Sequence, residues 1–401
     1  MAFTNDLRSR SPIPSPPRPS QGEPVAITWS GATWGLAGLG LVNFLLTVIT
    51  VGVYHFWAKT EVRRRIMSSV RINGEPLEYT GTGTELFLGF LIVFVLILLP
   101  ILIALYTAQI FLGVWGALAV LPINLLIFYL YGVALFRARR YRRSRLRWRG
   151  VRGAMVGSSW AYGWHALWSS ILLPFTLMFL WPWRDNFLHA KLMRAGRFGD
   201  KPFGFAGGSG PLYPRYTLVF LLTFLALALI GGLGGVIVFR TVKPLFDAMQ
   251  QAKAQGVTID WNSPEMAIFK PLIWTATAMG VGLYAALLLA VMLIWSFYRT
   301  RVMTYFATQT TLDQATFGLR PSGWGLFWVT FSGLLLSIFT LTILSPVAEA
   351  RVARYLVRRM TVTGTVDFAG IVQSAQTLSK TGEGLAEAFD VDTSSSFILS
   401  I

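Results

Sequence analysis

The sequence predicts an all-α, polytopic membrane protein with about seven apolar segments. Of its 401 residues, 54% are hydrophobic and 13% are charged, whereas soluble domains contain about 45–50% and about 25% of these classes. A helix needs about 20 apolar residues to cross the hydrocarbon core of a bilayer. Six charge-free stretches exceed that length, and the longest has room for two helices with a turn near Tyr106–Gln109. They are Gly31–Ala58, Leu86–Phe136, Trp160–Trp183, Tyr216–Phe239, Pro271–Tyr298 and Pro321–Ala348.

The two ends of the chain differ in composition from its middle. Residues 1–26 contain the Pro- and Ser-rich run from Ser11 to Ser20, and such a run lacks the apolar residues that a folded core requires. We therefore expect a disordered N-terminal tail over 1–26, a helical membrane domain over 27–375, and a flexible C-terminal tail over 376–401.

Positive charge is concentrated between the apolar segments. The net charge is +17, and most Lys and Arg residues fall into five basic stretches, around Lys59–Arg71, Arg137–Arg152, Arg184–Arg215, Arg299–Arg320 and Arg351–Arg359. Because basic loops stay on the cytoplasmic side of a membrane, all five are expected in the cytoplasm of a bacterium, with the chain in its inner membrane.

This rule places both ends of segments one, four and seven on the same side, which a single crossing does not allow. Either the rule fails at one loop, or these three segments are re-entrant. Helix breakers at Gly38 and Gly40, at Pro174 and at Gly333 permit a bend if the freed backbone groups are buried in protein. We favour the re-entrant interpretation.

An internal three-fold repeat connects the same three segments. Trp34, Trp160 and Trp324 each precede a threonine by 16 residues, at Thr50, Thr176 and Thr340, and Trp57 and Trp183 follow the first two threonines by seven residues. The predicted units cover about 28–83, 154–209 and 318–372. Repeats of this kind often enclose a central site in membrane transporters.

The first unit also carries a family resemblance. The run from Leu41 to Lys59, which includes Val-Gly-Val-Tyr-His-Phe-Trp57, continues through Arg63-Arg-Arg65 to Asn73-Gly-Glu-Pro-Leu-Glu-Tyr79-Thr-Gly81. This region resembles the YjgN family of bacterial inner-membrane proteins, also known as domain of unknown function 898. The resemblance implies a location and a topology class, and it transfers no functional residue because the activity of the family is unassigned.

The residues needed for catalysis or metal binding are scarce. The chain has no Cys and three His, and these form neither a His-x-x-x-His nor a His-Glu-x-x-His pattern. Of these, His165 lies within segment four, where an ionisable residue is a functional candidate, although an interfacial position explains it more simply. We expect no enzyme activity, no cofactor and no metal.

The densest basic stretch suggests contact with lipid. Anionic headgroups attract such charges, and the residues expected to contact them are Arg137, Arg139, Arg140, Arg142, Arg143, Arg145 and Arg147. An orientation signal alone also accounts for these arginines. The expected partners are therefore the lipid bilayer and anionic lipid headgroups rather than nucleic acid, and the sequence specifies no oligomeric state.

Two functions follow from these features. The repeat and the broken segments favour a membrane protein that transports or binds a small or amphiphilic molecule. The basic stretches favour an envelope scaffold that organises anionic lipids without transport. The sequence alone identifies no substrate.

Overall fold

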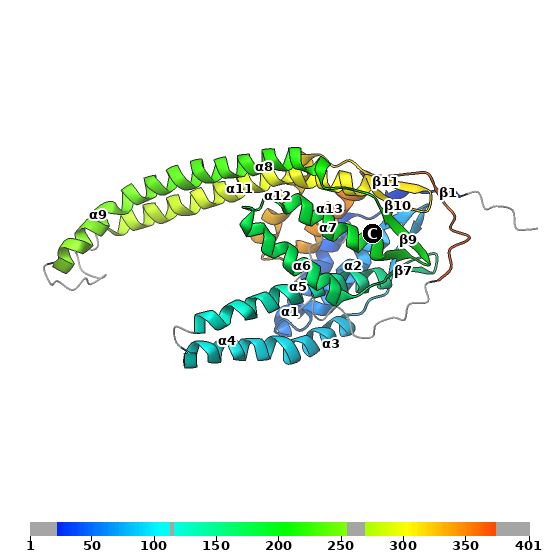
Figure 1. The fold of residues 1–401 in the computed structure, drawn as a ribbon, viewed down its shortest axis with the longest axis horizontal. Coiled ribbons are helices and arrows are strands. Elements are labelled where there is room, and N and C mark those ends of the chain that lie inside the picture. The colour runs from blue at the N-terminus through cyan, green and yellow to red at the C-terminus, as the bar shows by residue number, and fades with distance from the viewer. Residues whose placement is uncertain (1–21, 113–115, 255–268, 374–401) are drawn as a thin grey trace, which may run out of the picture.

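The computed structural model describes residues 22–112, 116–254 and 269–373. They form a helical body that ends in a curved antiparallel sheet (Figure 1). The predominance of helix agrees with the prediction, whereas the sheet does not, so the all-α class is wrong. The sheet is built largely from the basic stretches that the sequence suggested were loops.

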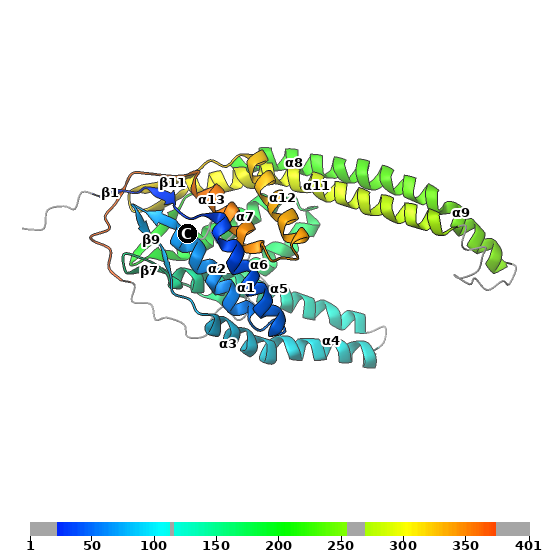
Figure 2. The same cartoon turned by 180° about the vertical axis from the view of Figure 1, so that it is seen from behind.

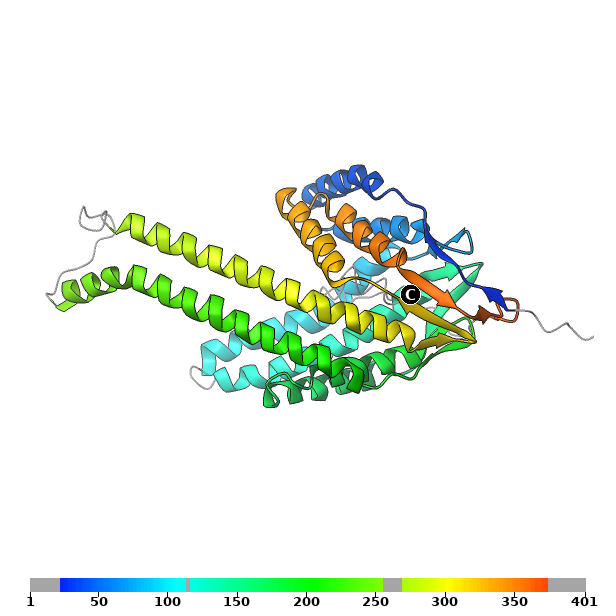
Figure 3. The same ribbon diagram turned by 90° about the horizontal axis from the view of Figure 1, so that it is seen from above.

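Two long helical hairpins project from the sheet (Figure 3). The first runs out through α3 (Gly83–Val93), the π-helical η2 (Phe94–Leu98) and α4 (Leu99–Leu112), and returns through α5 (Gly116–Arg145). The second runs out through η4 (Gly210–Leu212), α8 (Tyr213–Ala226), the π-helical η5 (Leu227–Leu233) and α9 (Gly234–Ala254), and returns through α11 (Lys270–Thr308).

These hairpins supply four helices that are long and apolar enough to cross a membrane within the described residues. They cover Gly83–Ala108, Val120–Arg145, Gly210–Gln251 and Lys270–Thr308. Four of the seven predicted segments thus correspond to possible spans. The turn expected near Tyr106–Gln109 is wrong, because α4 continues to Leu112, and residues 113–115 lie outside the described part.

The other three apolar segments lie in short helical hairpins (Figure 2). These are η1 (Thr33–Leu36) and α1 (Ala37–Ile49) with α2 (His55–Ser69), α6 (Ser159–Phe175) with α7 (Trp181–Ala195), and α12 (Gly323–Phe339) with α13 (Ser345–Val357). Each hairpin is flanked by strands on both sides in the chain, so each leaves the sheet and returns to it.

The tips of the three short hairpins share one hydrogen-bonding pattern. Thr50, Thr176 and Thr340 each donate their hydroxyl to the carbonyl four residues earlier and accept from the backbone N–H four residues later. The two residues after each threonine have positive φ angles, between 47° and 90°. Four of these six are Leu, Met or Thr at Leu177, Met178, Leu341 and Thr342, where the left-handed conformation costs about 1–2 kcal/mol per residue.

The strands lie before, between and after the helical hairpins in the chain. They are β1 (Glu23–Pro24), β2 (Ile27–Trp29), β3 (Val70–Ile72), β4 (Glu75–Pro76), β5 (Glu78–Tyr79), β6 (Leu146–Trp148), β7 (Val151–Met155), β8 (Gly196–Phe198), β9 (Lys201–Phe205), β10 (Thr310–Leu312), β11 (Ala315–Leu319), β12 (Met360–Thr363) and β13 (Thr365–Val366).

Sequential antiparallel pairing brings the five basic stretches to one end of the molecule. Strands β5 to β12 form an eight-stranded sheet in chain order, β2 to β4 form a second sheet, and β1 pairs with β13. Leu77 alone separates β4 from β5, and β12 contacts β2. The strands therefore form a nearly closed ring. Strand β1 lies within the stretch 1–26 that was expected to be disordered, and residues 1–21 and 374–401 lie outside the described part.

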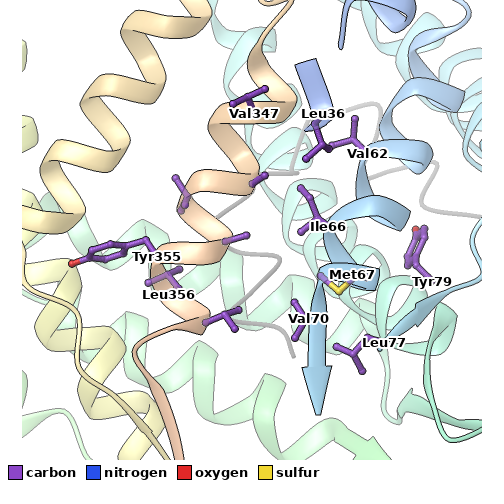
Figure 4. Packing of buried hydrophobic residues seen from close by; sticks show 14 of the residues in the cluster. Leu36, Val62, Ile66, Met67, Val70, Leu77, Tyr79, Val347, Tyr355 and Leu356 are labelled. Carbon is purple, nitrogen blue, oxygen red and sulfur yellow. The ribbon is translucent and has the colours of Figure 1, made fainter. Parts of the chain in front are cut away.

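The largest apolar core joins the first short hairpin to the third. Met67 of α2 and Val70 of β3 pack with Val347 and Leu356 of α13 (Figure 4), and all four are at most 2% exposed. The core lies where these helices join the sheet. It stabilises the part of the ring in which β2 contacts β12.

Candidate functional site

The main cavity of the described structure lies where α5, α7 and α11 meet the inner face of the ring. Its volume is about 550 Å³, within the range of about 300–1,000 Å³ typical of pockets that hold one small ligand. Much of its wall is apolar. The strands contribute Ile27, Ile72, Phe198, Phe203, Leu312, Phe317, Leu319, Met360 and Val362, and the helices contribute Leu135, Leu188, Leu192, Val302 and Met303.

Helix α5 brings arginines to this cavity. Residues four apart lie on the same face of a helix, and both Arg139 and Arg143 line the cavity. Arg143 is 5% exposed, donates to the carbonyl of Leu192 at 3.5 Å, and has its guanidinium 5.5 Å from the ring centre of Phe203. Gly196 permits this position, since a Cβ atom there would overlap the guanidinium of Arg143.

Helix α7 supplies an acid and a histidine at the same spacing. Burial raises the pKa of Asp185, while Arg184, Arg299 and Arg139 act in the opposite direction. Burial, together with Arg139 and Arg143, lowers the pKa of His189 to about 3. At neutral pH the imidazole of His189 is therefore uncharged, and its ring stacks on Phe306 of α11 with centroids 4.0 Å apart.

Several buried polar atoms of the cavity residues have no hydrogen-bond partner within the described part of the chain. They are Nε of Arg139, Arg147 and Arg197, Nε1 of Trp148, Nε2 of His189 and Oη of Tyr298. A buried polar atom without a partner costs about 1–3 kcal/mol. A polar ligand group in the cavity would supply partners for these atoms.

The arginines predicted to contact lipid are distributed over three environments. Arg137 is exposed, with its guanidinium 5.1 Å from the ring centre of Trp160, and Arg140 donates to the carbonyl of Gly157. Arg142 and Arg145 are buried outside the cavity, whereas Arg139, Arg143 and Arg147 line it. The run is a helix end followed by strand β6, so the expected loop at this position is wrong.

The residues that defined the predicted repeat lie at corresponding places in the three short hairpins. Trp34, Trp160 and Trp324 are exposed at the beginning of the first helix of each hairpin, and the three threonines form the tips. Trp57 and Trp183 lie near the beginning of the returning helices α2 and α7. None of these eight residues lines the main cavity.

Sequence reasoning did not identify the acid of the site or its aromatic partners. The sequence did not lead us to place Asp185, His189 and Tyr298 in one site, although the four-residue spacing of Asp185 and His189 indicates one helix face. His165, the histidine that was singled out, lies elsewhere: its Nδ1 accepts a hydrogen bond from Trp168 at 3.3 Å, and it does not line the cavity.

A second, smaller cavity of about 350 Å³ lies between the first and third short hairpins. His55, Lys59 and Arg63, each four residues apart on α2, face it together with Glu349 of α13. Asn43 of α1 is 6% exposed, and its side-chain amide has no partner within the described residues. Polar side chains therefore line this cavity, although the exposed surface of α1 beside it is apolar.

Metal ligands do not cluster in the described residues, where no group of three or more His, Asp or Glu side chains could hold an ion. The arrangement of the main cavity instead suits a molecule with an apolar part and an acceptor-rich polar part.

Comparisons with known proteins give a family. The family described as a bacterial protein of unknown function (DUF898) matches residues 24–388. Inner membrane protein YjgN of Salmonella typhimurium is 46% identical over 56 residues, which is 14% of this chain and 14% of that protein. Inner membrane protein YjgN of Escherichia coli O157:H7 is 28% identical over 151 residues, 38% of this chain and 36% of that protein. The chain therefore matches about a third or less of the length of these relatives, and no solved structure matches it.

Proposed function

This chain belongs to the DUF898 family of bacterial proteins of unknown function, and we propose that it binds a small or amphiphilic molecule in the main cavity and transports it in the inner membrane. The observation that carries this proposal is the cavity itself. Its walls combine apolar side chains with polar atoms that lack partners in the described structure. Pockets with mostly apolar walls and a few convergent polar groups are typical ligand sites.

The proposed placement in the membrane follows from the two kinds of hairpin. The four long helices span the bilayer, and the ring of strands lies in the cytoplasm, where the positive-inside rule places its arginines. The short hairpins are re-entrant. Each begins with a helical stretch of 17 residues, about 25 Å long and thus shorter than the hydrocarbon core of about 30 Å.

The exposed tips support this placement. Val51, Phe175, Leu177, Phe339 and Leu341 are each more than 70% exposed, which suits side chains that face lipid. We regard the three hairpins as copies of one unit, because their threonine tips share the same hydrogen bonds. In this arrangement the strands that flank the hairpins supply much of the wall of the main cavity.

A substitution that fills the cavity tests the proposal. Val302 of α11 lines the cavity, and in Val302→Trp the indole occupies space that the ligand requires. Val281 lies on the same helix and is 64% exposed, so Val281→Trp is the matched control. We expect native mass spectrometry of protein released from its own membranes to show a bound amphiphile with the natural chain and with Val281→Trp, and its loss with Val302→Trp.

The same experiment addresses the alternative of a lipid-organising scaffold. The exposed pair of Arg137 and Trp160 favours headgroup contact at the surface, because aromatic and basic side chains gather at membrane interfaces. If Val302→Trp retains as much bound amphiphile as Val281→Trp does, the ligand lies outside the cavity. That result would exclude the cavity proposal and favour the scaffold.

A further inference from the structure

The chemistry of the cavity identifies the class of its ligand, provided that the proposed function holds. We infer that the ligand is an amphiphile with one apolar chain and a compact anionic headgroup, such as a phosphate or a carboxylate. The headgroup contacts Arg139 and Arg143 in the last turns of α5 and His189 of α7. The alkyl chain of the ligand lies against the apolar inner face of the ring.

Charge is the first argument. Asp185 is the one carboxylate among the lining residues, whereas Arg139, Arg143 and Arg184 bring three positive charges to the cavity from α5 and α7. Removing positive charge from water is costly unless an opposite charge compensates it, and Arg143 is 5% exposed while Arg139 and Arg184 are half-buried. Asp185 attracts Arg184 and Arg139, and one carboxylate balances at most one of these charges. An anionic ligand adds compensation for this excess of positive charge.

Hydrogen bonding is the second argument. The Nε atom of Arg139 and the Nε1 atom of Trp148 can donate but not accept, and neither has a partner within the described residues. A phosphate or an ionised carboxylate offers acceptors only. Guanidinium groups bind both oxyanions through paired, charge-assisted hydrogen bonds. Donors of this kind do not favour a cation or an amine.

The positions of these donors place the headgroup. Arg139 and Arg143 occupy the last turns of α5, and His189 lies in the middle of α7. Arg139 and Arg143 lie close enough to His189 to lower its pKa, so these side chains converge on one part of the cavity. His189, uncharged at neutral pH, adds a donor without adding to the positive charge.

The apolar wall of the cavity accommodates the alkyl chain of the ligand. Phe198, Phe203, Leu312 and Phe317 contribute strand side chains to the cavity. Phe368 closes one side, because its ring packs at 4.6 Å from that of Trp148, and the segment after it is held to the β8–β9 turn by two hydrogen bonds between Val372 and Asp200. The volume of about 550 Å³ is that of a pocket for one small ligand, which favours one chain over two.

The experiment measures binding of four probes to the full-length protein in nanodiscs of zwitterionic lipid. Dodecyl phosphate and dodecanoate carry the anionic headgroups, dodecanol has the chain without charge, and inorganic phosphate has the charge without a chain. We expect both anionic amphiphiles to bind at least about 10-fold more tightly than dodecanol, since hydrogen bonds to charged groups contribute about 1.5–3 kcal/mol. Inorganic phosphate should compete weakly. The ratio of phosphate to carboxylate affinity distinguishes the two headgroups.

Charge-neutral variants locate the headgroup. Arg139→Gln and Arg143→Gln should each weaken dodecyl phosphate binding about 10-fold and leave dodecanol binding nearly unchanged. Arg137→Gln, two residues before Arg139 on the same helix but exposed, should change neither. Dodecanol binding also reports whether each variant is folded, and the second variant keeps the test valid if the first does not fold.

The outcomes separate this inference from the proposed function. Equal binding of dodecanol and dodecyl phosphate, with no effect of Arg139→Gln or Arg143→Gln, overturns the anionic headgroup but leaves an amphiphile-binding cavity. Strong competition by inorganic phosphate would show that the alkyl chain of the ligand does not contribute to binding. If Val302→Trp binds every probe as the natural protein does, the proposed function itself fails.

Discussion

The substitution Glu85→Ala is expected to lower the free energy of unfolding by about 3–5 kcal/mol, because it leaves a buried arginine without its carboxylate. Glu85 accepts from Nη2 of Arg145 at 2.5 Å and from the hydroxyl of Tyr141 at 2.6 Å. The side chains of Arg145 and Glu85 are 10% and 23% exposed. The pair joins the start of α3 to the end of α5, where the first long hairpin meets the sheet.

Thermal and denaturant unfolding in the same detergent measures this effect. Glu61→Ala is the matched control, because Glu61 pairs with Arg64 at 2.9 Å on the surface, where the two side chains are 34% and 50% exposed. Exposed pairs contribute about 0–1 kcal/mol. Equal, small losses in both variants would show that the Glu85–Arg145 pair does not stabilise the junction of helix and sheet.

A second large effect is expected at the contact of α5 with α6. Gly132 and Gly163 face each other there, and a Cβ atom at Gly163 would lie 2.5 Å from Cγ2 of Val133 and 3.0 Å from the carbonyl oxygen of Tyr129. Gly163→Leu must therefore separate the helices, at a cost of about 1–3 kcal/mol or more. It also displaces α5, whose arginines line the cavity, so ligand binding should weaken together with stability.

The control for this variant is Gly280→Leu. Gly280 lies on α11 with open space around the position of a Cβ atom, so a leucine there should leave both stability and binding nearly unchanged. Unfolding measurements and dodecyl phosphate binding are made on both variants. If Gly163→Leu retains full stability, the close approach of α5 and α6 is not what holds the arginines in place.

The membrane helices were predictable because their signal is local. Stretches such as Tyr216–Phe239 and Pro271–Tyr298 carry no charge over the length of a span, and length and polarity suffice to identify such helices. The same local signal did not locate the end of α4 correctly, since apolar residues continue on both sides of the actual connection.

The sheet escaped prediction because its strands are short and its pairing is distant in sequence. Strand β6 is Leu-Arg-Trp and β8 is Gly-Arg-Phe, and three residues do not establish an alternating pattern. A hairpin signal was present at Asn73-Gly74, where both residues have positive φ angles between β3 and β4, as a type I′ turn requires. It was noted as part of the family resemblance rather than as a turn.

The sequence identified only part of the candidate site. It identified the arginines of α5, but whether each arginine contacts lipid or the cavity depends on the side of the helix on which it lies, and that depends on packing. Asp185 and His189 reach the site from α7 only because β7 pairs with β8. Tyr298 reaches it from α11 because β9 pairs with β10. Such long-range contacts leave no mark on local composition.

Labelling of single cysteines in intact cells and inverted vesicles tests the central claim, that the four long helices cross the membrane and the three short hairpins enter it from the cytoplasmic side. The chain has no cysteine of its own. A membrane-impermeant maleimide should label cysteines at the strand turns near Gly74, Arg149 and Asp313 from the cytoplasmic side, and one at Ala254, where α9 ends, from the periplasmic side. Cysteines at the tips, Val51, Leu177 and Leu341, should react from neither side. Labelling of the tips from the periplasm would contradict the account, because the hairpins would then cross the membrane.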